Sequence, residues 1–178
     1  LLDRVQAEGA LERVTFTGGE PLLHPQVLDL VEAANRRELG VSFISNGRRV
    51  DAALARALGD RWVWSVQLTL ADADAPGHDA ACGPGSFDGA LAALAHLQAA
   101  GVPVSASLLV TRQSAHRAGE TALRLAREGV TQLAFNRFNP SGFARDAAER
   151  WMPTRSQLLG ALAAVDRVAG ELELDVTC

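Results

Sequence analysis

The stretch Arg13-Val-Thr-Phe-Thr-Gly-Gly-Glu-Pro-Leu-Leu-His-Pro25 decides the fold, because a β-rich run stops at two glycines, an acid and a proline just before an amphipathic helix. Two adjacent glycines allow the backbone to approach a bound molecule or to take a positive φ. Glu20 adds a carboxylate, which holds an ammonium group by a charge-assisted hydrogen bond. The stretch therefore predicts a loop that binds a small ligand with a positive amine. The alternative is an ordinary turn from a strand to a helix.

Strand patterns and helix patterns alternate along the rest of the chain, with short loops between them. We expect strands at residues 13–17, 41–45, 62–70, 104–110, 130–138 and 172–176. The helices between them are expected to begin at or near Pro25, Asp51, Ser86, Ala115 and Thr154, the last with a capping box to Gln157. This alternation is typical of βαβ units around a parallel sheet.

The glycines and polar residues gather at the carboxyl ends of the expected strands. Barrel enzymes of the βα type build their sites at that end. A closed or partial βα barrel therefore fits better than a solenoid, although a repeat of roughly 25–35 residues would also be compatible with stacked units.

Composition limits the functional classes. With 178 residues, 48% of them hydrophobic, the chain is long enough for one sizeable core, and we expect a single domain over residues 1–178. The net charge of −4 gives no basic surface for nucleic acid or for an anionic membrane, and neither partner is expected. Two cysteines, Cys82 and Cys178, do not make a disulfide framework, and no signal peptide or membrane-spanning run is visible. These features predict a cytoplasmic protein.

Several segments, taken in order, resemble radical S-adenosylmethionine (SAM) enzymes. The Gly-Gly-Glu-Pro run of the first stretch resembles the GGEP loop of that superfamily. Later segments resemble strand ends and loops of its peptide-modifying branch, whose members often carry a SPASM auxiliary-cluster domain. These segments are Ile44-Ser-Asn-Gly47, Val66-Gln-Leu-Thr-Leu-Ala71, His78-Asp79 with Gly83-Pro-Gly-Ser-Phe87, Thr111, and Arg137-Phe-Asn-Pro-Ser-Gly142.

The resemblance implies an α/β fold, a partial TIM-like (βα)6 barrel of the radical SAM type whose first strand is missing. It also implies an oxidoreductase that cleaves SAM reductively at a [4Fe-4S] cluster, forming a 5′-deoxyadenosyl radical that takes a hydrogen atom from a peptide or a peptide-derived precursor. The implied partners are a peptide or small-molecule substrate and an electron donor such as flavodoxin or ferredoxin. In such enzymes the protein mostly binds, orients and shields.

The resemblance also assigns cofactor-binding roles to individual residues. The backbone of Gly18 and Gly19 and the carboxylate of Glu20 would hold the SAM amino group, with Pro21 fixing the turn. The remaining assignments are polar contacts to the methionyl and ribose parts from Ser45, Asn46 and Thr69, and a bidentate pairing of Arg137 with the ligand carboxylate. Plain capping of strand ends, and a surface position for the arginine, are the alternatives.

The chain departs from the family pattern in three places. The family's CxxxCxxC motif lies upstream of the GGEP loop and is not present, so we expect a fragment with no metal ligand or catalytic residue of its own and no activity by itself. The strand-end Asp of the family is Ala71 here, although Asp72 and Asp74 lie nearby. His78 and Asp79 suggest acid–base chemistry or, with no visible partner, a hydrogen-bonded pair that closes a loop.

The two cysteines are expected to differ. Cys82 is interpreted as an isolated thiol. For Cys178 the resemblance leaves open whether it is the first ligand of an auxiliary-cluster region. Two other functions remain open: a non-catalytic barrel that keeps the pocket and binds a small ligand or peptide, and an unrelated barrel such as a phosphate-binding aldolase. A Schiff-base aldolase is excluded because the chain has no lysine.

Two architectural expectations follow. The first five strands should be parallel neighbours in sequence order, with Glu20, Asn46, Thr69 and Arg137 lining one mouth. With the first strand missing, one barrel edge should be unpaired, and apolar residues such as Phe16 and Phe43 should be less covered than in an intact enzyme.

Overall fold

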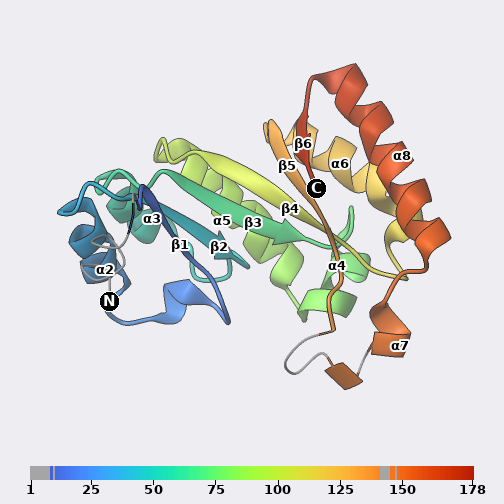
Figure 1. Ribbon diagram of the computed structural model, residues 1–178, viewed down its shortest axis with the longest axis horizontal. Helices are drawn as coiled ribbons and strands as arrows, with labels where there is room; N and C mark the ends of the chain where they lie inside the picture. The colour runs from blue at the N-terminus through green and yellow to red at the C-terminus, as the bar shows by residue number, and fades with distance from the viewer. Residues whose placement is uncertain (1–8, 10, 141–144, 147) are drawn as a thin grey trace. The chain divides into compact units, whose positions relative to one another are not determined.

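The computed structural model describes residues 9, 11–140, 145–146 and 148–178 (Figure 1). The sequence also allows residues 1–8 to be the end of a helix, and these residues lie outside this range. The strands are β1 (Arg13–Phe16), β2 (Gly40–Ser45), β3 (Ser65–Leu70), β4 (Val104–Val110), β5 (Gln132–Arg137) and β6 (Asp175–Thr177). The helices are η1 (Pro21–Leu23), α2 (Val27–Asn35), α3 (Ala52–Gly59), α4 (Ala75–Cys82), α5 (Ser86–Ala99), η2 (Ala115–Arg117), α6 (Ala118–Arg127), α7 (Ala148–Trp151) and α8 (Arg155–Leu172). None of these helices has both the length and the apolar character needed to cross a membrane.

The strands follow one another in the sheet in sequence order, β1 to β6. The pairs β1–β2, β2–β3, β4–β5 and β5–β6 are parallel. Parallel neighbours need a crossover between them, and the helices of the chain supply it. The expected α/β fold with strands in chain order is confirmed. The chain divides into two compact units, residues 1–68 with 89–104 and residues 69–88 with 105–178.

The first unit is built on β1, β2 and most of β3, with a core of aliphatic side chains. In the sheet Phe16 is opposite Phe43, and their rings stack with centroids 5.3 Å apart. Phe43 is 1% exposed and Phe16 is half-buried. The expected loss of cover is therefore not seen at Phe43, because its own unit buries it, whereas for Phe16 it stays a prediction. The core also contains Val31, Val41, Leu58, Val66, Leu68 and Leu97.

In the second unit, α8 lies along α6 (Figure 1). Gly119 of α6 permits the close approach, since a Cβ there would stand 3.2 Å from the Cβ of Ala164. The expected capping box is present: the Thr154 hydroxyl accepts from the Gln157 N–H at 3.2 Å, and the Gln157 side chain accepts from the Thr154 N–H at 2.9 Å. The core of this unit includes Leu108, Leu125, Leu133, Ala161 and Val165.

Two expectations about local structure were wrong. Leu172 ends helix α8 instead of opening a strand, because Glu173 takes a left-handed conformation with φ of 53° and the strand begins only at Asp175. His78 and Asp79 were assigned to a loop but lie on helix α4. This helix tolerates Pro76 because a proline in the first turn loses no intrahelical hydrogen bond.

His78 and Asp79 close the segment that follows β3, each through its own partners. His78 is 1% exposed, and its Nδ1 accepts a hydrogen bond from the Ala71 N–H at 3.0 Å. The Asp79 carboxylate accepts from the Gly85 N–H, the Phe87 N–H and the Ser86 hydroxyl at 2.6, 2.9 and 3.0 Å. The loop-closing interpretation is thus the one that the contacts favour. Burial lowers the pKa of His78. The pKa of Asp79 is also lowered, chiefly because its carboxylate accepts a hydrogen bond from the Phe87 N–H.

We predict that His78 makes the fold less stable in mild acid. In the unfolded chain a histidine has a pKa of about 6.5, whereas the folded pKa is lower, so below about pH 6.5 the unfolded state binds more protons. Stability is therefore present above that pH and is lost as the pH falls. His78→Asn keeps an acceptor near the Ala71 N–H but does not titrate. Urea unfolding at about pH 7.5 and about pH 5.5 should show a smaller loss for this variant than for the parent chain.

The matched control is His116→Asn, because His116 is exposed. It should retain the pH dependence of the unsubstituted chain. Equal losses of unfolding free energy in the His78 variant and the unsubstituted chain would contradict the assignment.

Candidate functional site

The carboxylate of Glu20 joins the loop after β1 to the end of β2. Its Oε1 accepts hydrogen bonds from the Leu22 N–H at 3.1 Å and from the Ser45 hydroxyl at 2.8 Å. Its Oε2 accepts from the Asn46 N–H at 2.8 Å. We call this set of three bonds the Glu20 clamp. It exists because β1 and β2 are parallel neighbours, so their carboxyl ends meet at one edge of the sheet.

Pro21 and Glu20 together set the turn that follows the glycines. Glu20 has extended backbone angles and caps the short helix η1, in which Pro21 occupies the first turn. An acid is a favourable N-cap because its oxygen accepts from a backbone N–H that has no partner within the helix. The expected role of Pro21 in fixing the turn agrees with this geometry.

Gly18 and Gly19 leave the loop backbone open. Gly18 has a φ of 126°, a conformation that side chains rarely adopt. A Cβ built on either glycine would meet no other atom within 4 Å, and both residues are exposed. A ligand can therefore reach this backbone directly. Because a carboxylate offers about four lone-pair positions and the clamp uses three, Glu20 also has room for an ammonium donor.

Ser45 and Asn46 are brought to Glu20, but they differ in what their side chains do. Ser45 is 3% exposed, and its hydroxyl both donates to Glu20 and accepts from the Gly47 N–H at 3.0 Å. It therefore acts by holding Glu20 in position. Asn46 is exposed, and its Oδ1 accepts from the Arg48 N–H at 3.0 Å, which leaves its amide NH₂ facing solvent.

Gly47 is a position that only glycine fits. Its φ is 78°, and a Cβ there would stand 2.9 Å from the Cβ of Ala93 and 3.2 Å from the Cα of Ala90, both on α5. A side chain would thus be strained by backbone conformation and by contact with the helix. The positive φ and the contact with α5 therefore both require glycine at this point of the turn after β2.

Thr69 and Arg137 belong to the second unit. Thr69 is half-buried near the end of β3, and Arg137 is the exposed last residue of β5, opposite Val110. The expected convergence of these two residues with Glu20 and Asn46 on one mouth stays a prediction. Residues 141 and 142 of the matching segment lie outside the described range.

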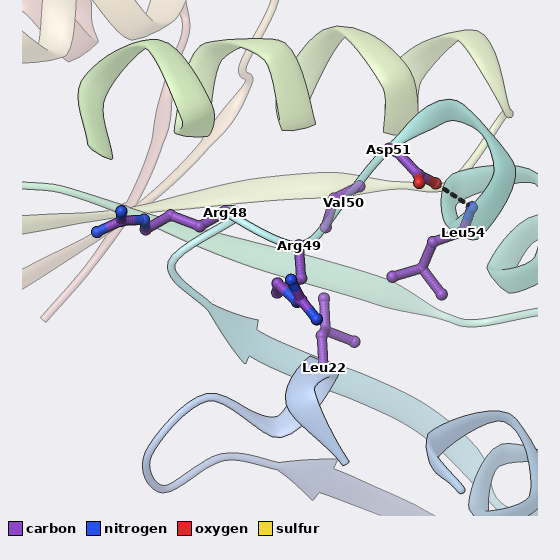
Figure 2. A pocket seen from close by; sticks show the side chains of 6 residues that line it. All are labelled: Leu22, Arg48, Arg49, Val50, Asp51 and Leu54. Carbon is purple, nitrogen blue, oxygen red and sulfur yellow. Dashed lines mark hydrogen bonds between the residues drawn. The ribbon is translucent and has the colours of Figure 1, made fainter. Parts of the chain in front are cut away.

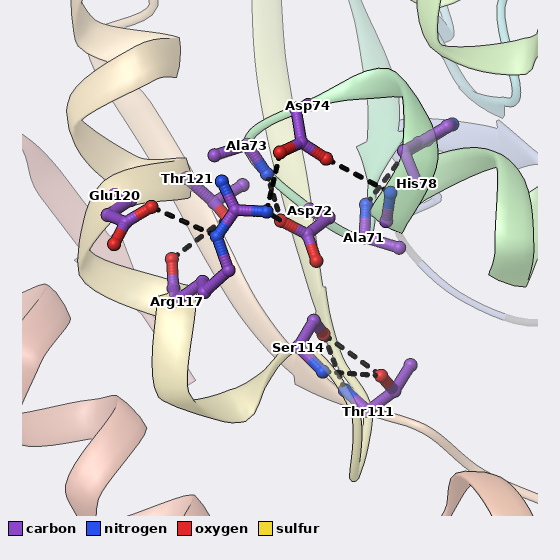
Figure 3. A network of polar contacts seen from close by, with 11 residues as sticks. Ala71, Asp72, Ala73, Asp74, His78, Thr111, Ser114, Arg117, Glu120 and Thr121 are labelled. Carbon is purple, nitrogen blue, oxygen red and sulfur yellow. Dashed lines mark hydrogen bonds and ion pairs between the residues drawn. The ribbon is translucent and has the colours of Figure 1, made fainter.

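An ion-pair network in the second unit was not expected from the sequence (Figure 3). Arg117, just before α6, contacts Asp72 at 2.8 Å, Asp74 at 2.7 Å and Glu120 at 3.0 Å. Asp72 is 5% exposed, and burial raises its pKa although Arg117 opposes the shift. Nothing in the sequence indicates the pairing of Arg117 with Asp72 and Asp74, because these residues lie far apart in the chain.

Cys82 has the properties of an isolated thiol, as expected. Burial raises its pKa to about 11, so it is protonated at neutral pH and is a poor metal ligand. Within the described residues no group of three or more histidine, cysteine, aspartate or glutamate side chains is arranged to hold a metal ion. Cys178 is exposed at the end of the chain.

An open glycine loop held by an acid lies here at the carboxyl edge of a parallel α/β sheet, which is the edge where barrel enzymes build their sites. The model of the Radical SAM superfamily matches residues 1–125, and the chain belongs to that superfamily.

Known relatives and solved structures agree with this family. The mycofactocin maturase MftC of Mycobacterium tuberculosis is 37% identical over 145 residues, covering 81% of this chain and 37% of the relative. The PqqA peptide cyclase of Streptomyces rochei is 34% identical over 166 residues, covering 89% and 45%. SuiB of Streptococcus suis, solved bound to S-adenosylmethionine, superposes with a TM-score of 0.81 at 14% identity, covering 99% of this chain and 41% of that chain. The chain spans less than half the length of these relatives, and the structural likeness confirms the fold class.

We predict that Gly47→Ala destabilises the first unit. The strained φ alone costs about 1 kcal/mol, and the contact with α5 adds to it. Urea unfolding should show a loss of at least about 1 kcal/mol relative to the unsubstituted chain. Gly85→Ala is a useful comparison, because Gly85 also has a positive φ, of 70°, but open space around it. An equal loss in both variants would show that packing against α5 contributes nothing.

We predict that the two thiols react at different rates. At about pH 8, iodoacetamide should modify Cys178 much faster than Cys82, because alkylation requires a thiolate and Cys82 is held protonated and half-buried. Peptide mass spectrometry of a time course separates the two sites. Equal rates in the folded protein would contradict the burial of Cys82, and full denaturation should abolish the difference.

Proposed function

We propose that residues 1–178 form part of the core domain of a longer radical SAM enzyme, which cleaves SAM reductively at a [4Fe-4S] cluster and modifies a peptide or peptide-derived precursor. The Glu20 clamp is the observation that carries this proposal, since it presents two open glycines and a partly available carboxylate at the carboxyl edge of the sheet. Membership of the superfamily supports it.

The chain's own residues would hold the amino-acid part of SAM. The backbone of Gly18 and Gly19 would face the amino group, and the free lone pair of Glu20 Oε2 would take one of its protons. Ser45 would act through Glu20, because both of its hydrogen-bonding directions are occupied within the protein. Asn46, Thr69 and Arg137 would supply the remaining polar contacts.

When bound, SAM and the reduced cluster supply a 5′-deoxyadenosyl radical, and the protein orients and shields it. We assign no catalytic residue and no ligand of the SAM-cleaving cluster among the described residues. Cys178 is the one described residue for which a ligand role, in an auxiliary-cluster region, is proposed.

Peptide modification is supported by the relatives, one of which is a PqqA peptide cyclase. Reductive cleavage also requires an electron, for which flavodoxin or ferredoxin is the proposed donor in a reducing cytoplasm. The net charge of −4 supports a protein without a nucleic-acid partner.

The test uses the longer protein that contains this chain. After anaerobic reconstitution with iron and sulfide it should show the absorbance of a [4Fe-4S] centre and, with a reductant, convert SAM to 5′-deoxyadenosine, measured by chromatography. The 178-residue chain alone should do neither. A full-length protein that binds SAM but carries no cluster would favour the non-catalytic alternative instead.

We predict that Glu20→Gln in the longer protein weakens SAM binding by about 1–3 kcal/mol, the scale for losing a charge-assisted hydrogen bond in a shielded site. Anaerobic calorimetry measures the change, and the cluster absorbance should be unaffected. The affinity for 5′-methylthioadenosine, which has no amino group, should change far less. This comparison separates loss of the ammonium contact from general loosening of the clamp.

Glu12→Gln is the matched control, because Glu12 is an exposed acid next to the opposite end of β1. It should leave both affinities unchanged. Unchanged SAM affinity in the Glu20 variant would remove the assignment.

A further inference from the structure

A pocket of about 470 Å³ lies in the first unit, on the segment that follows the Glu20 clamp. Its lining comes from η1, from the turn that joins β2 to α3 and from the first turn of α3 (Figure 2): Leu22, Arg48, Arg49, Val50, Asp51 and Leu54. No side chain of this lining is assigned a contact with SAM above, although the backbone N–H groups of Leu22 and Arg48 bond to Glu20 and Asn46.

The two arginines are available for a ligand. Both are exposed, and within the described part of the chain neither guanidinium makes an ion pair or a hydrogen bond. Figure 2 shows the side chain of Arg49 reaching toward Leu22, whereas Arg48 extends to the other side of the turn. Asp51 is the only acid of the lining, and its carboxylate accepts the Leu54 N–H at 2.7 Å as the cap of α3. The lining therefore carries a net positive charge.

The backbone that carries these arginines is held in place before any ligand arrives. The Arg48 N–H donates to the Asn46 side chain, and the Val50 N–H donates to the Gly47 carbonyl at 2.9 Å. The stem of Arg48 also lies beside Gly89 of α5, where a Cβ would stand 3.6 Å from the Arg48 Cγ. A site whose backbone is already ordered loses less entropy on binding.

The lining combines this charge with apolar surface. Leu22 and Val50 are each 6% exposed, and Leu54 is half-buried. A guanidinium pairs with a carboxylate through two parallel hydrogen bonds, while aliphatic walls suit the methylene groups that carry that carboxylate.

We propose that this pocket binds an acidic residue of the peptide substrate, with Arg49 pairing with its carboxylate and Arg48 contributing charge at the rim. The peptide nature of the ligand rests on the proposed function. The anion-binding character of the pocket rests on the lining alone.

The test is direct binding to the 178-residue chain, with no cluster or SAM present. The probe is the hexapeptide Gly-Val-Glu-Val-Glu-Gly, blocked at both ends and carrying a neutral fluorophore, and the comparison is the same peptide with Gln for Glu. Fluorescence anisotropy should show binding of the Glu peptide at least about tenfold tighter than of the Gln peptide, since one charge-assisted pairing is worth about that factor or more. Arg49→Gln should remove the difference between the two peptides.

Arg56→Gln is the matched control, because Arg56 is an exposed arginine on α3 outside the lining. It should bind both peptides as the unsubstituted chain does, and thermal unfolding should show all variants folded. Equal binding of the two peptides, or equal loss in the Arg56 and Arg49 variants, would overturn the proposal. Competition by inorganic phosphate without discrimination between the peptides would also overturn it, in favour of a phosphate site.

The longer protein separates this inference from the proposed function. Arg49→Gln should leave SAM affinity unchanged there, and a loss of SAM affinity would overturn the proposal by giving the arginine to the cofactor. If the longer protein prefers the Glu peptide but does not cleave SAM, the result supports the proposed peptide pocket and contradicts the proposed enzyme activity. SAM cleavage without such discrimination would refute the pocket alone.

Discussion

The geometry of the candidate site depends on one half-buried carboxylate. Glu20 accepts hydrogen bonds from the Leu22 N–H, the Ser45 hydroxyl and the Asn46 N–H, and so holds together two segments 25 residues apart in the chain. Hydrogen bonds to an ionised acceptor contribute about 1.5–3 kcal/mol, more than neutral ones. Glycine-rich loops lose much backbone entropy when they are ordered, so an anchor of this strength is required to fix Gly18 and Gly19 for a ligand.

The influence of that anchor extends along the turn after β2. Asn46 is fixed through its N–H, its side chain fixes the Arg48 N–H, and Asp51 then caps α3. Within the turn, the N–H groups of Gly47, Arg48 and Val50 donate to the Ser45 hydroxyl, the Asn46 side chain and the Gly47 carbonyl. The glycine loop and the arginine pocket therefore lie on adjoining segments that the Glu20 clamp and the hydrogen bonds of this turn keep ordered.

The sequence predicted features that depend on neighbouring residues better than features that depend on residues far apart in the chain. Local signals were reliable: Asp51 caps α3, Thr154 and Gln157 form a capping box, and the six strands follow in chain order. Two predictions were wrong because local signals conflicted. Pro76 and Gly77 disfavoured a helix where α4 forms, and the alternation of apolar residues and acids from Leu172 suggested a strand where α8 ends. Hydrogen bonds and ion pairs between side chains far apart in the chain were not predicted. Glu20 was singled out for its ligand, not for the three protein donors that its carboxylate accepts.

The network around Arg117 bears on the strand-end acid that the family has and this chain lacks. Asp72 is close in sequence to that position, but its Oδ1 accepts from the Ala73 N–H and pairs with Arg117, and the residue is 5% exposed. Removing one partner of a buried ion pair costs about 3–5 kcal/mol. Gly77 packs so tightly that a Cβ there would overlap the Asp72 carboxylate. Asp72 is thus committed to structure. Asp72 therefore cannot replace the carboxylate that the resemblance places at position 71, and a contact of Thr69 with a ligand stays a prediction.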